Sequence, residues 1–219
     1  MRKALFLFMV FGLVGLMCGC EVGTTALSES DISDDYNEEV KKSLRKLILT
    51  GNCKECPFVG VDISGKDLSH KDLTGADLEG ANLSQADLKF AKLKDADLNK
   101  ANLSQADLTG ANLIRADLTK ADLTEADLTG ANLTGADLTK ANLKDADLNK
   151  ANLFLANLRN ADLFMADLKD ADLTGADLRD ADLTEADLTG AKIKNTRNLD
   201  SAIKCKTIFS WGKDNSGCK

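Results

Sequence analysis

The sequence predicts an all-β solenoid, in which the chain turns a corner after every five residues. Two regularities indicate this fold. An aliphatic residue occupies every fifth position from Ile63 to Ile193, which gives 27 such centres. An alanine stands two residues before each centre from Ala76 to Ala191, 24 times in succession. No proline interrupts the stretch, so every amide in it is able to donate to a neighbouring coil.

A period of five residues fits neither an α-helix nor a flat strand. Along an α-helix the centres would be stepped by about 140° each, so no continuous apolar stripe would form. In a square coil, the centre and its alanine point inward and the other three residues point outward. Four pentapeptides then make one turn of about 20 residues, and the stack has about 7 coils over roughly 32 Å.

Each position of the repeat has a physical role. Stacked leucines form the core, where burial of each side chain contributes roughly 2 kcal/mol, and alanine lets opposite walls approach. Asp, Asn, Ser, Thr and Gly suit the corners, because turns need their side chains or their backbone freedom. Only neighbouring coils can bury the centres, so the stability of each coil depends on the stack.

This A-(D/N)-L-x-x register resembles that of the pentapeptide repeat proteins, and the resemblance covers residues 56 to about 208. It implies a right-handed quadrilateral β-helix. It also implies that enzymatic activity is not a family trait, and that the best-understood members mimic DNA and bind topoisomerases. No nucleophile–base pair is evident in the sequence, so we expect no catalytic residue, no cofactor and no small-molecule substrate.

Residues 1–20 have the pattern of a secretory signal. Arg2 and Lys3 precede an apolar stretch from Leu5 to Met17, which is too short for a comfortable membrane span. The segment ends in Met-Cys-Gly-Cys and resembles a bacterial lipobox, which implies lipidation of Cys20. We therefore expect a lipid-anchored protein of the bacterial cell envelope, at the outer membrane or the periplasmic face. Ordinary secretion is the alternative.

The remaining segments flank the repeat region. Residues 21–35 are polar and are expected to form a flexible tether. Residues 36–55 contain an amphipathic helix, capped by Ser33 or Asp34 and ending near Gly51, which would cover the open end of the solenoid; binding to a partner is the alternative. Residues 56–195 form the repeat domain. In the C-terminal cap, residues 196–219, Ile203 and Ile208 keep the fivefold phase.

Four cysteines remain once the signal segment is set aside: Cys53, Cys56, Cys205 and Cys218. The two pairs lie at opposite ends of the predicted rod, so they cannot bind one zinc ion together. Export favours disulfides, and we predict Cys53–Cys56 and Cys205–Cys218, each closing one cap. Free thiols and a metal site are the alternatives.

The outward residues hold the candidate binding sites. From Asp62 to Lys192 there are 25 acidic and 15 basic residues, so we expect no direct binding of nucleic acid. One face carries an unbroken column of seven carboxylates: Asp67, Asp87, Asp107, Asp127, Asp147, Asp167 and Asp187. This acidic column has two interpretations. It is either a docking face for basic proteins or only the turn chemistry of the repeat.

Outward apolar residues suggest a second site. Phe154 and Leu155 lie on one face and Phe164 and Met165 on the opposite face of about one coil, so the two pairs cannot form one flat patch. We expect a contact with a protein partner or self-association there. Taken together, the sequence predicts a non-enzymatic, envelope-anchored scaffold that binds proteins or serves a structural role. The alternative is an acidic, DNA-mimic-like inhibitor of a nucleic-acid-binding enzyme such as a topoisomerase.

Overall fold

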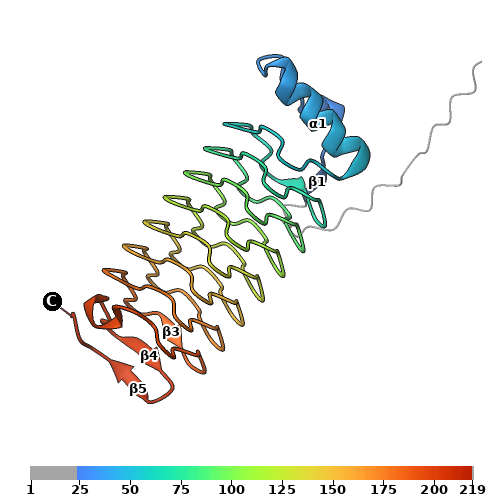
Figure 1. Ribbon diagram of the computed structural model, residues 1–219. Helices are drawn as coiled ribbons and strands as arrows, with labels where there is room; N and C mark the ends of the chain where they lie inside the picture. The colour runs from blue at the N-terminus through green and yellow to red at the C-terminus, as the bar shows by residue number, and fades with distance from the viewer. Residues whose placement is uncertain (1–23, 219) are drawn as a thin grey trace, which may run out of the picture.

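The protein is a stack of square coils with a helix at one end and a short β-hairpin at the other (Figure 1). The computed structural model describes residues 24–218, so the signal segment and Cys20 lie outside the described residues. Between residues 24 and 218, no helix combines the length and the apolar character needed to span a membrane.

Backbone pairing shows that one turn takes 20 residues, as the period predicts. Parallel bridges join each residue that precedes a centre to the residue twenty positions later, from Asn52 and Asp72 to Asp177 and Arg197. Within each bridge the leucine amide donates to the next coil, as from Leu108 to the carbonyl of Asp127 at 2.7 Å. Amides of successive coils therefore form continuous ladders on all four faces.

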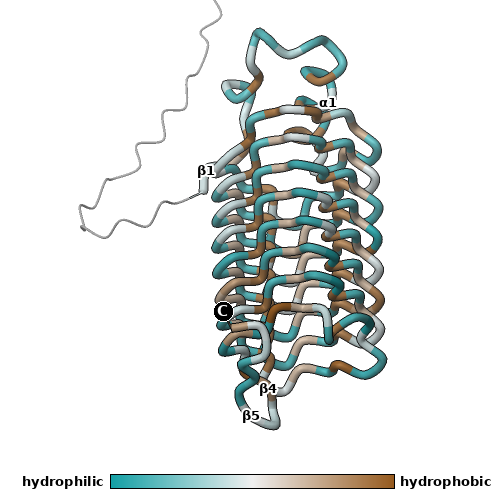
Figure 2. The backbone as a smooth tube through the Cα atoms, turned by 90° about the vertical axis from the view of Figure 1, so that its left-hand side faces the viewer, coloured by the Kyte–Doolittle hydropathy of each residue, from teal (hydrophilic) through white to brown (hydrophobic). Residues whose placement is uncertain are grey.

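The inward positions are those that the pattern predicts. Every alanine and leucine of the repeat from Ala76 to Leu188 is at most 1% exposed. Hydropathy along the tube accordingly repeats from one coil to the next (Figure 2). The apolar core thus runs without interruption through the stack. Each coil buries its inward side chains only because a neighbouring coil lies on either side of it.

The corners have one repeated geometry. The second residue after each centre has a left-handed backbone at every corner from Glu55 to Asn195, including the non-glycine residues. The Asp or Asn before most centres accepts a hydrogen bond from the amide two residues later, as Asp127 does from Thr129 at 2.8 Å. This side-chain bond compensates part of the strain that a side chain at positive φ imposes.

Helix α1 (Glu38–Thr50) lies at the N-terminal end of the stack (Figure 1). The sequence-based expectation that Ser33 or Asp34 caps it is wrong, because Asn37 is the N-cap and its side chain accepts from the Val40 amide at 2.9 Å. The helix ends at Gly51 in the left-handed conformation, as expected. Val40, Leu44 and Leu47 are buried against the first coil and form part of the core.

The expected tether is partly folded onto the solenoid. Strand β1 (Thr25–Ala26) pairs in parallel with β2 (Lys66–Asp67), and a 3-10 helix, η1 (Glu29–Asp31), follows. Lys66 takes the place of an inward alanine and instead pairs with Asp31 at 2.7 Å. Leu27 and Ile32 pack against the core. Two apolar side chains and one ion pair therefore fix a polar segment in which we expected no structure.

The backbone at the outer edge of the first coil is capped separately on each of its four faces. The Asn52 amide donates to the Thr50 hydroxyl at 3.1 Å, and the Asp62 amide donates to the Tyr36 hydroxyl at 2.9 Å. Pro57 has no amide proton, and Asp67 belongs to the strand paired with β1. No face of the first coil therefore presents a free amide ladder of the kind that promotes edge-to-edge pairing.

The C-terminal end departs from the repeat by one residue. A 3-10 helix, η2 (Leu199–Ser201), lengthens the last turn, so Asp182 pairs with Ile203, twenty-one positions later. The expectation that Ile203 and Ile208 remain inward centres is therefore wrong: they are 41% and 38% exposed. Ala202, Lys204, Thr207 and Phe209 are buried in their place.

Three strands finish the chain. Strand β3 (Asp187–Leu188) pairs in parallel with β4 (Thr207–Phe209), which pairs antiparallel with β5 (Gly212–Asp214). The exposed Trp211 stacks on the buried Phe209 with 4.6 Å between ring centroids. Disulfides join Cys205 to Cys218 at this end of the rod and Cys53 to Cys56 at the other end.

Candidate binding faces of the solenoid

The four faces of the rod can be defined from the hydrogen bonds of the coil. On each face, the residue before the centre and the residue after it lie together, because their side chains bond to each other, as Thr124 does to Asp122 at 2.6 Å. We name the faces by their first leucine: A from Leu68, B from Leu73, C from Leu78 and D from Leu83. Residues twenty positions apart share a face, and faces A and C are opposite, as are B and D.

Face A carries the acidic column, and the structure places all seven carboxylates in line. Backbone bridges connect each member to the next, from Asp67 and Asp87 to Asp167 and Asp187. In every member, the Oδ1 atom accepts from the amide two residues later. Half of each carboxylate therefore stabilises the turn. The second oxygen, Oδ2, pairs with a lysine in four members of the column and, within the described part of the chain, has no such partner in Asp67, Asp127 and Asp147.

Two lysines divide the acidic column into segments. Lys89 lies 3.6 Å from Asp87 and 2.7 Å from Asp107, and Lys169 lies 2.6 Å from Asp167 and 3.2 Å from Asp187. Sequence reasoning missed both lysines, although they stand two positions after an Asp of the column. Among the described residues, Asp67, Asp127 and Asp147 have no cation within salt-bridge distance, so the uncompensated acid lies at the N-terminal end and at the middle of the column.

Turn bonds and lysines keep members of the column ionised. Hydrogen bonds from the Ser69 hydroxyl and amide hold the pKa of Asp67 below its ordinary value. For Asp107 and Asp187, burial raises the pKa, but bonds from the neighbouring lysine and threonine outweigh burial, and the net pKa is lowered. These carboxylates therefore carry full negative charge near neutral pH.

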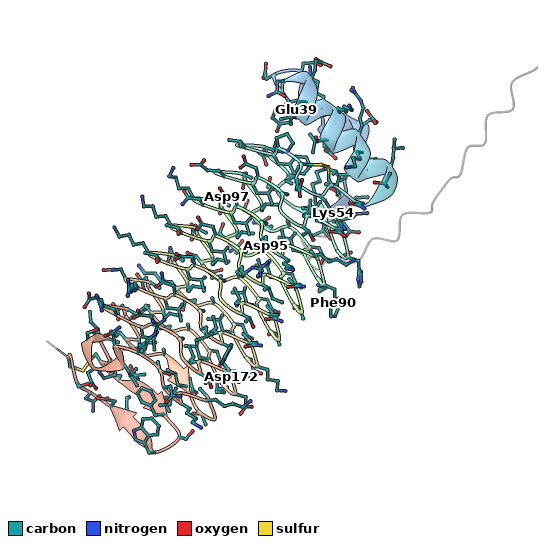
Figure 3. The ribbon with its side chains drawn as sticks, in the orientation of Figure 1. Glu39, Lys54, Phe90, Asp95, Asp97 and Asp172 are labelled. Carbon is teal, nitrogen blue, oxygen red and sulfur yellow. A yellow bond between two sulfur atoms is a disulfide. The ribbon has the colours of Figure 1, made fainter. Side chains whose placement is uncertain are left out.

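Face C is acidic but internally compensated. Asp177 is only 2% exposed, and it accepts from Arg159 at 2.8 Å and from Asn198 at 2.7 Å. Lys100 pairs with Glu79 at 2.7 Å. Basic side chains therefore neutralise part of the acidic charge of this face. In Figure 3, Asp97 marks face C, and Phe90 projects at the opposite side of the view.

The charges on faces B and D have opposite signs. Among the residues directly before and after each centre, without the corners, face B has five lysines against two aspartates, a net charge of +3: Lys54, Lys92, Lys94, Lys192 and Lys194 against Asp72 and Asp172. Face D has four aspartates against one lysine, a net charge of −3: Asp62, Asp122, Asp162 and Asp182 against Lys144. The rod is therefore polarised across its width, which the composition of the chain alone does not show.

The two apolar pairs occupy these opposite faces. Phe154 and Leu155, at face B, are 40% and 53% exposed, and Met165, at face D, is 49% exposed. Phe164 is half-buried and lines a hollow of about 350 Å³ together with Lys144, Asp145, Asp162 and Asp182. The structure thus keeps the pairs apart, as the sequence indicated, and Phe164 of the face D pair adjoins a concave surface.

Two other surface features lie near the N-terminal end of the rod. A groove of about 390 Å³ lies between α1 and the first coil, lined in part by Lys42, Lys46, Lys54 and Cys56. His70 stacks on Phe90 with 5.3 Å between the ring centroids. In the described part of the chain, no group of three or more His, Cys, Asp or Glu side chains is arranged to hold a metal ion.

Comparison with protein families settles what the repeat geometry suggests. Residues 52–89, 86–124, 121–160 and 161–197 match the family described as pentapeptide repeats. The chain belongs to the pentapeptide repeat family. Proteins of this family form right-handed quadrilateral β-helices, which agrees with the twenty-residue turn found here. A comparison with curated proteins gives no significant match.

Solved pentapeptide repeat structures resemble this chain. HetL from the cyanobacterium Nostoc sp. strain PCC 7120, involved in heterocyst differentiation regulation, is 29% identical over 81% of this chain and 99% of its own, with a TM-score of 0.37. A pentapeptide repeat protein from the Arabidopsis thaliana thylakoid lumen is 31% identical over 61% of this chain and 72% of its own, with a TM-score of 0.36. QnrB1, a plasmid-mediated fluoroquinolone resistance protein, is 24% identical over 77% of this chain and 81% of its own, with a TM-score of 0.40.

Proposed function

We propose that this pentapeptide repeat protein is a non-enzymatic, lipid-anchored scaffold of the bacterial cell envelope that docks a basic protein on the acidic column of face A. The lipid is carried by Cys20, and the domain stands at the outer membrane or the periplasmic face. The observation that carries the docking function is the alignment of seven carboxylates on a rigid ladder, in which the two central members, Asp127 and Asp147, have no lysine of the described chain within salt-bridge distance.

The physical basis of docking is long-range attraction followed by short contacts. A row of like charges about 4.8 Å apart produces a potential that attracts a basic surface and raises its rate of association. The ladder holds the carboxylates in place, so little conformational entropy is lost when a partner binds. Asp127 and Asp147, which lack lysine partners among the described residues, form the centre of the proposed contact.

The test uses asparagine, because the repeat already accepts it at the same position. Asn132 accepts from the Thr134 amide at 3.1 Å, as Asp127 does from Thr129. We therefore expect Asp107, Asp127, Asp147 and Asp167 to be replaceable by Asn with the turns intact. The control variant carries Asn in place of Asp77, Asp97, Asp117 and Asp137 on face C, which removes the same charge.

Binding partners are then recovered from envelope extract with the wild type and both variants. Loss of a basic partner with the face A variant, but not with the face C variant, supports the acidic column. Recovery of the same partners by all three proteins contradicts it. Lipid attachment is tested separately: Cys20→Ser should abolish labelling by palmitate and release the protein from the membrane fraction.

The alternative function is a DNA-mimic-like inhibitor of a nucleic-acid-binding enzyme such as a topoisomerase. The spacing of the acidic column favours it, because carboxylates along the rod repeat like the charges of a nucleic-acid backbone. Such an inhibitor needs a cytosolic location, whereas the signal segment favours export. An unprocessed cytosolic chain that inhibits DNA supercoiling, and loses this effect in the face A variant, would favour the alternative.

A further inference from the structure

Faces B and D, on opposite sides of the rod, carry complementary net charges. Face B is the only face with a net positive charge, because face A has seven aspartates against two lysines and face C six acidic residues against three arginines. Face D, directly opposite face B, has a net charge of −3. A second copy of the chain can therefore bring its face D against face B of the first with attraction between the two surfaces.

The exposed apolar residues also lie on faces B and D. Phe154 and Leu155 belong to face B, and Phe164 and Met165 belong to face D. The two pairs are ten residues apart, which is half a coil and about 2.4 Å along the rod axis. Phe154, Leu155 and Met165 are all at least 40% exposed. Each of the two complementary faces thus offers an apolar contact near the same height of the rod.

The hollow on face D fits a long basic side chain. Lys144 pairs with Asp162 at 3.1 Å, whereas Asp145 and Asp182 have no cationic partner among the described residues. Phe164 lines the same hollow. A lysine or arginine from outside can lay its aliphatic stem along the ring and place its charge between the two carboxylates. Face B supplies five lysines, of which Lys194 alone has no carboxylate within salt-bridge distance among the described residues. Arg115, at the corner of face B, pairs with Asp95 at 2.7 Å.

Contacts between identical faces are less favourable. Face B against face B opposes lysines. Face D against face D opposes carboxylates and brings no added cation to Asp145 and Asp182. We propose that the protein self-associates side by side, with face B of one copy on face D of the next. Such a contact is heterologous, so each added copy leaves one free face at either end, and the assembly is an open row.

This row is independent of the docking function proposed for face A, because face A is not part of the contact. The acidic column of every copy in the row points to the same or the opposite side, and remains accessible. A failure of the row therefore leaves the docking function untouched, and the face A variant described above is expected to assemble as the wild type does.

The test uses two variants with matched chemistry on opposite faces. The B variant is Phe154→Asp with Leu155→Asp, and the D variant is Phe164→Asp with Met165→Asp. Aspartate is compatible with the left-handed corner, because Asp95, Asp145 and Asp170 already adopt that conformation. All proteins carry Cys20→Ser so that no lipid is attached, and circular dichroism verifies that each variant is folded.

Sedimentation velocity at low salt, with the concentration raised to about 1 mM, measures association. We expect the wild type to form dimers and longer species, and roughly 0.5 M salt to shift them toward monomer by screening the charges. Each variant alone should associate at least tenfold more weakly. An equimolar mixture of the two variants should recover dimers but no longer species, because each keeps one intact face.

Three results would overturn the proposal. They are a wild type that stays monomeric over the whole concentration range, a mixture of the variants that stays monomeric, and loss of association in only one of the two variants. The last result would mean that the face altered in that one variant pairs with the same face of a second copy in a closed dimer.

Discussion

The ring of Phe90 lies over Gly110, one coil below it, so closely that a Cβ atom at residue 110 would come within 2.5 Å of the ring. Both residues stand at the same corner and both have left-handed backbones, with φ of +54° and +65°. The missing side chain of Gly110 thus gives Phe90 a place to lie along the rod, where it also stacks on His70.

A pair of alanine substitutions separates backbone strain from this contact. Gly130→Ala, where nothing lies within 4 Å of the new Cβ, should lower the free energy of unfolding by about 1 kcal/mol, the cost of a side chain in the left-handed conformation. Gly110→Ala should have at least this cost and should also displace Phe90 from His70. Denaturant unfolding measures the first effect, and the ring proton shifts of His70 in an NMR spectrum measure the second. Unchanged shifts would contradict the Phe90–Gly110 contact.

A leucine at the centre of the stack should be far more sensitive than an exposed one. Leu128 is fully buried, so Leu128→Ala should lower the free energy of unfolding by about 3–5 kcal/mol through lost burial and a cavity. Leu155→Ala, at an exposed corner, should change it by about 0.5 kcal/mol or less. Similar losses for both variants in urea unfolding would contradict the inward orientation of the repeat centres.

The two disulfides should differ in their access to reductant. Cys53 and Cys56 are at most 5% exposed, whereas Cys218 is exposed at the chain end. Mild reduction of the folded protein, followed by alkylation and intact-mass measurement, should therefore modify Cys205 and Cys218 first. Cys205→Ser with Cys218→Ser should lower the free energy of unfolding by about 3 kcal/mol, because the bond closes a loop of roughly that entropic cost. Simultaneous modification of all four cysteines would contradict the burial of the first pair.

Acid should destabilise the protein through a defined set of carboxylates. Burial raises the pKa of Asp177, but bonds from Asn198, the Arg179 amide and Arg159 outweigh it, so the pKa is lowered. The pKa values of Asp67, Asp107 and Asp187 are lowered as well. A carboxylate whose pKa is lowered in the folded state stabilises the protein at pH values above its unfolded-state pKa. This stabilisation is lost as the pH falls through the folded-state pKa.

We therefore expect the free energy of unfolding to fall as the pH drops below about 4, the ordinary pKa of aspartate. Asp177→Asn, which removes the most buried of these charges, should make this fall shallower. Thermal unfolding between pH 2 and pH 7 measures both curves. A wild-type melting temperature that rises on acidification would show that these bonds do not stabilise the ionised carboxylates.

The repeat region was predictable from sequence because one rule acts on every residue in it. A period of five with alanine and leucine leaves only one arrangement that buries both, so the inward positions, the twenty-residue turn and the membership of each face follow. The ends were less predictable, since each is built from contacts that occur once. The pairing of Lys66 with Asp31 and the extra residue near Leu199 have no periodic signal.

The binding faces were predictable in position but not in charge balance. The seven carboxylates of face A are evident from counting in steps of twenty. Their compensation by Lys89 and Lys169 depends on where flexible side chains reach, which the pattern of residues does not specify. The opposite charges of faces B and D required the residues before and after each centre to be assigned to the same face, and the hydrogen bonds of the turns supplied that assignment.

The closure of the first coil at Asn52, Pro57, Asp62 and Asp67 determines how the length of such a rod can change. New coils cannot be added above the first coil without replacing the three separate contacts and the proline that terminate it. Insertion between two internal coils has no such requirement, because every internal junction repeats the same ladder. A twenty-residue duplication would therefore lengthen the molecule by one layer while both ends stayed as they are, so variation in length is expected to arise from within the stack.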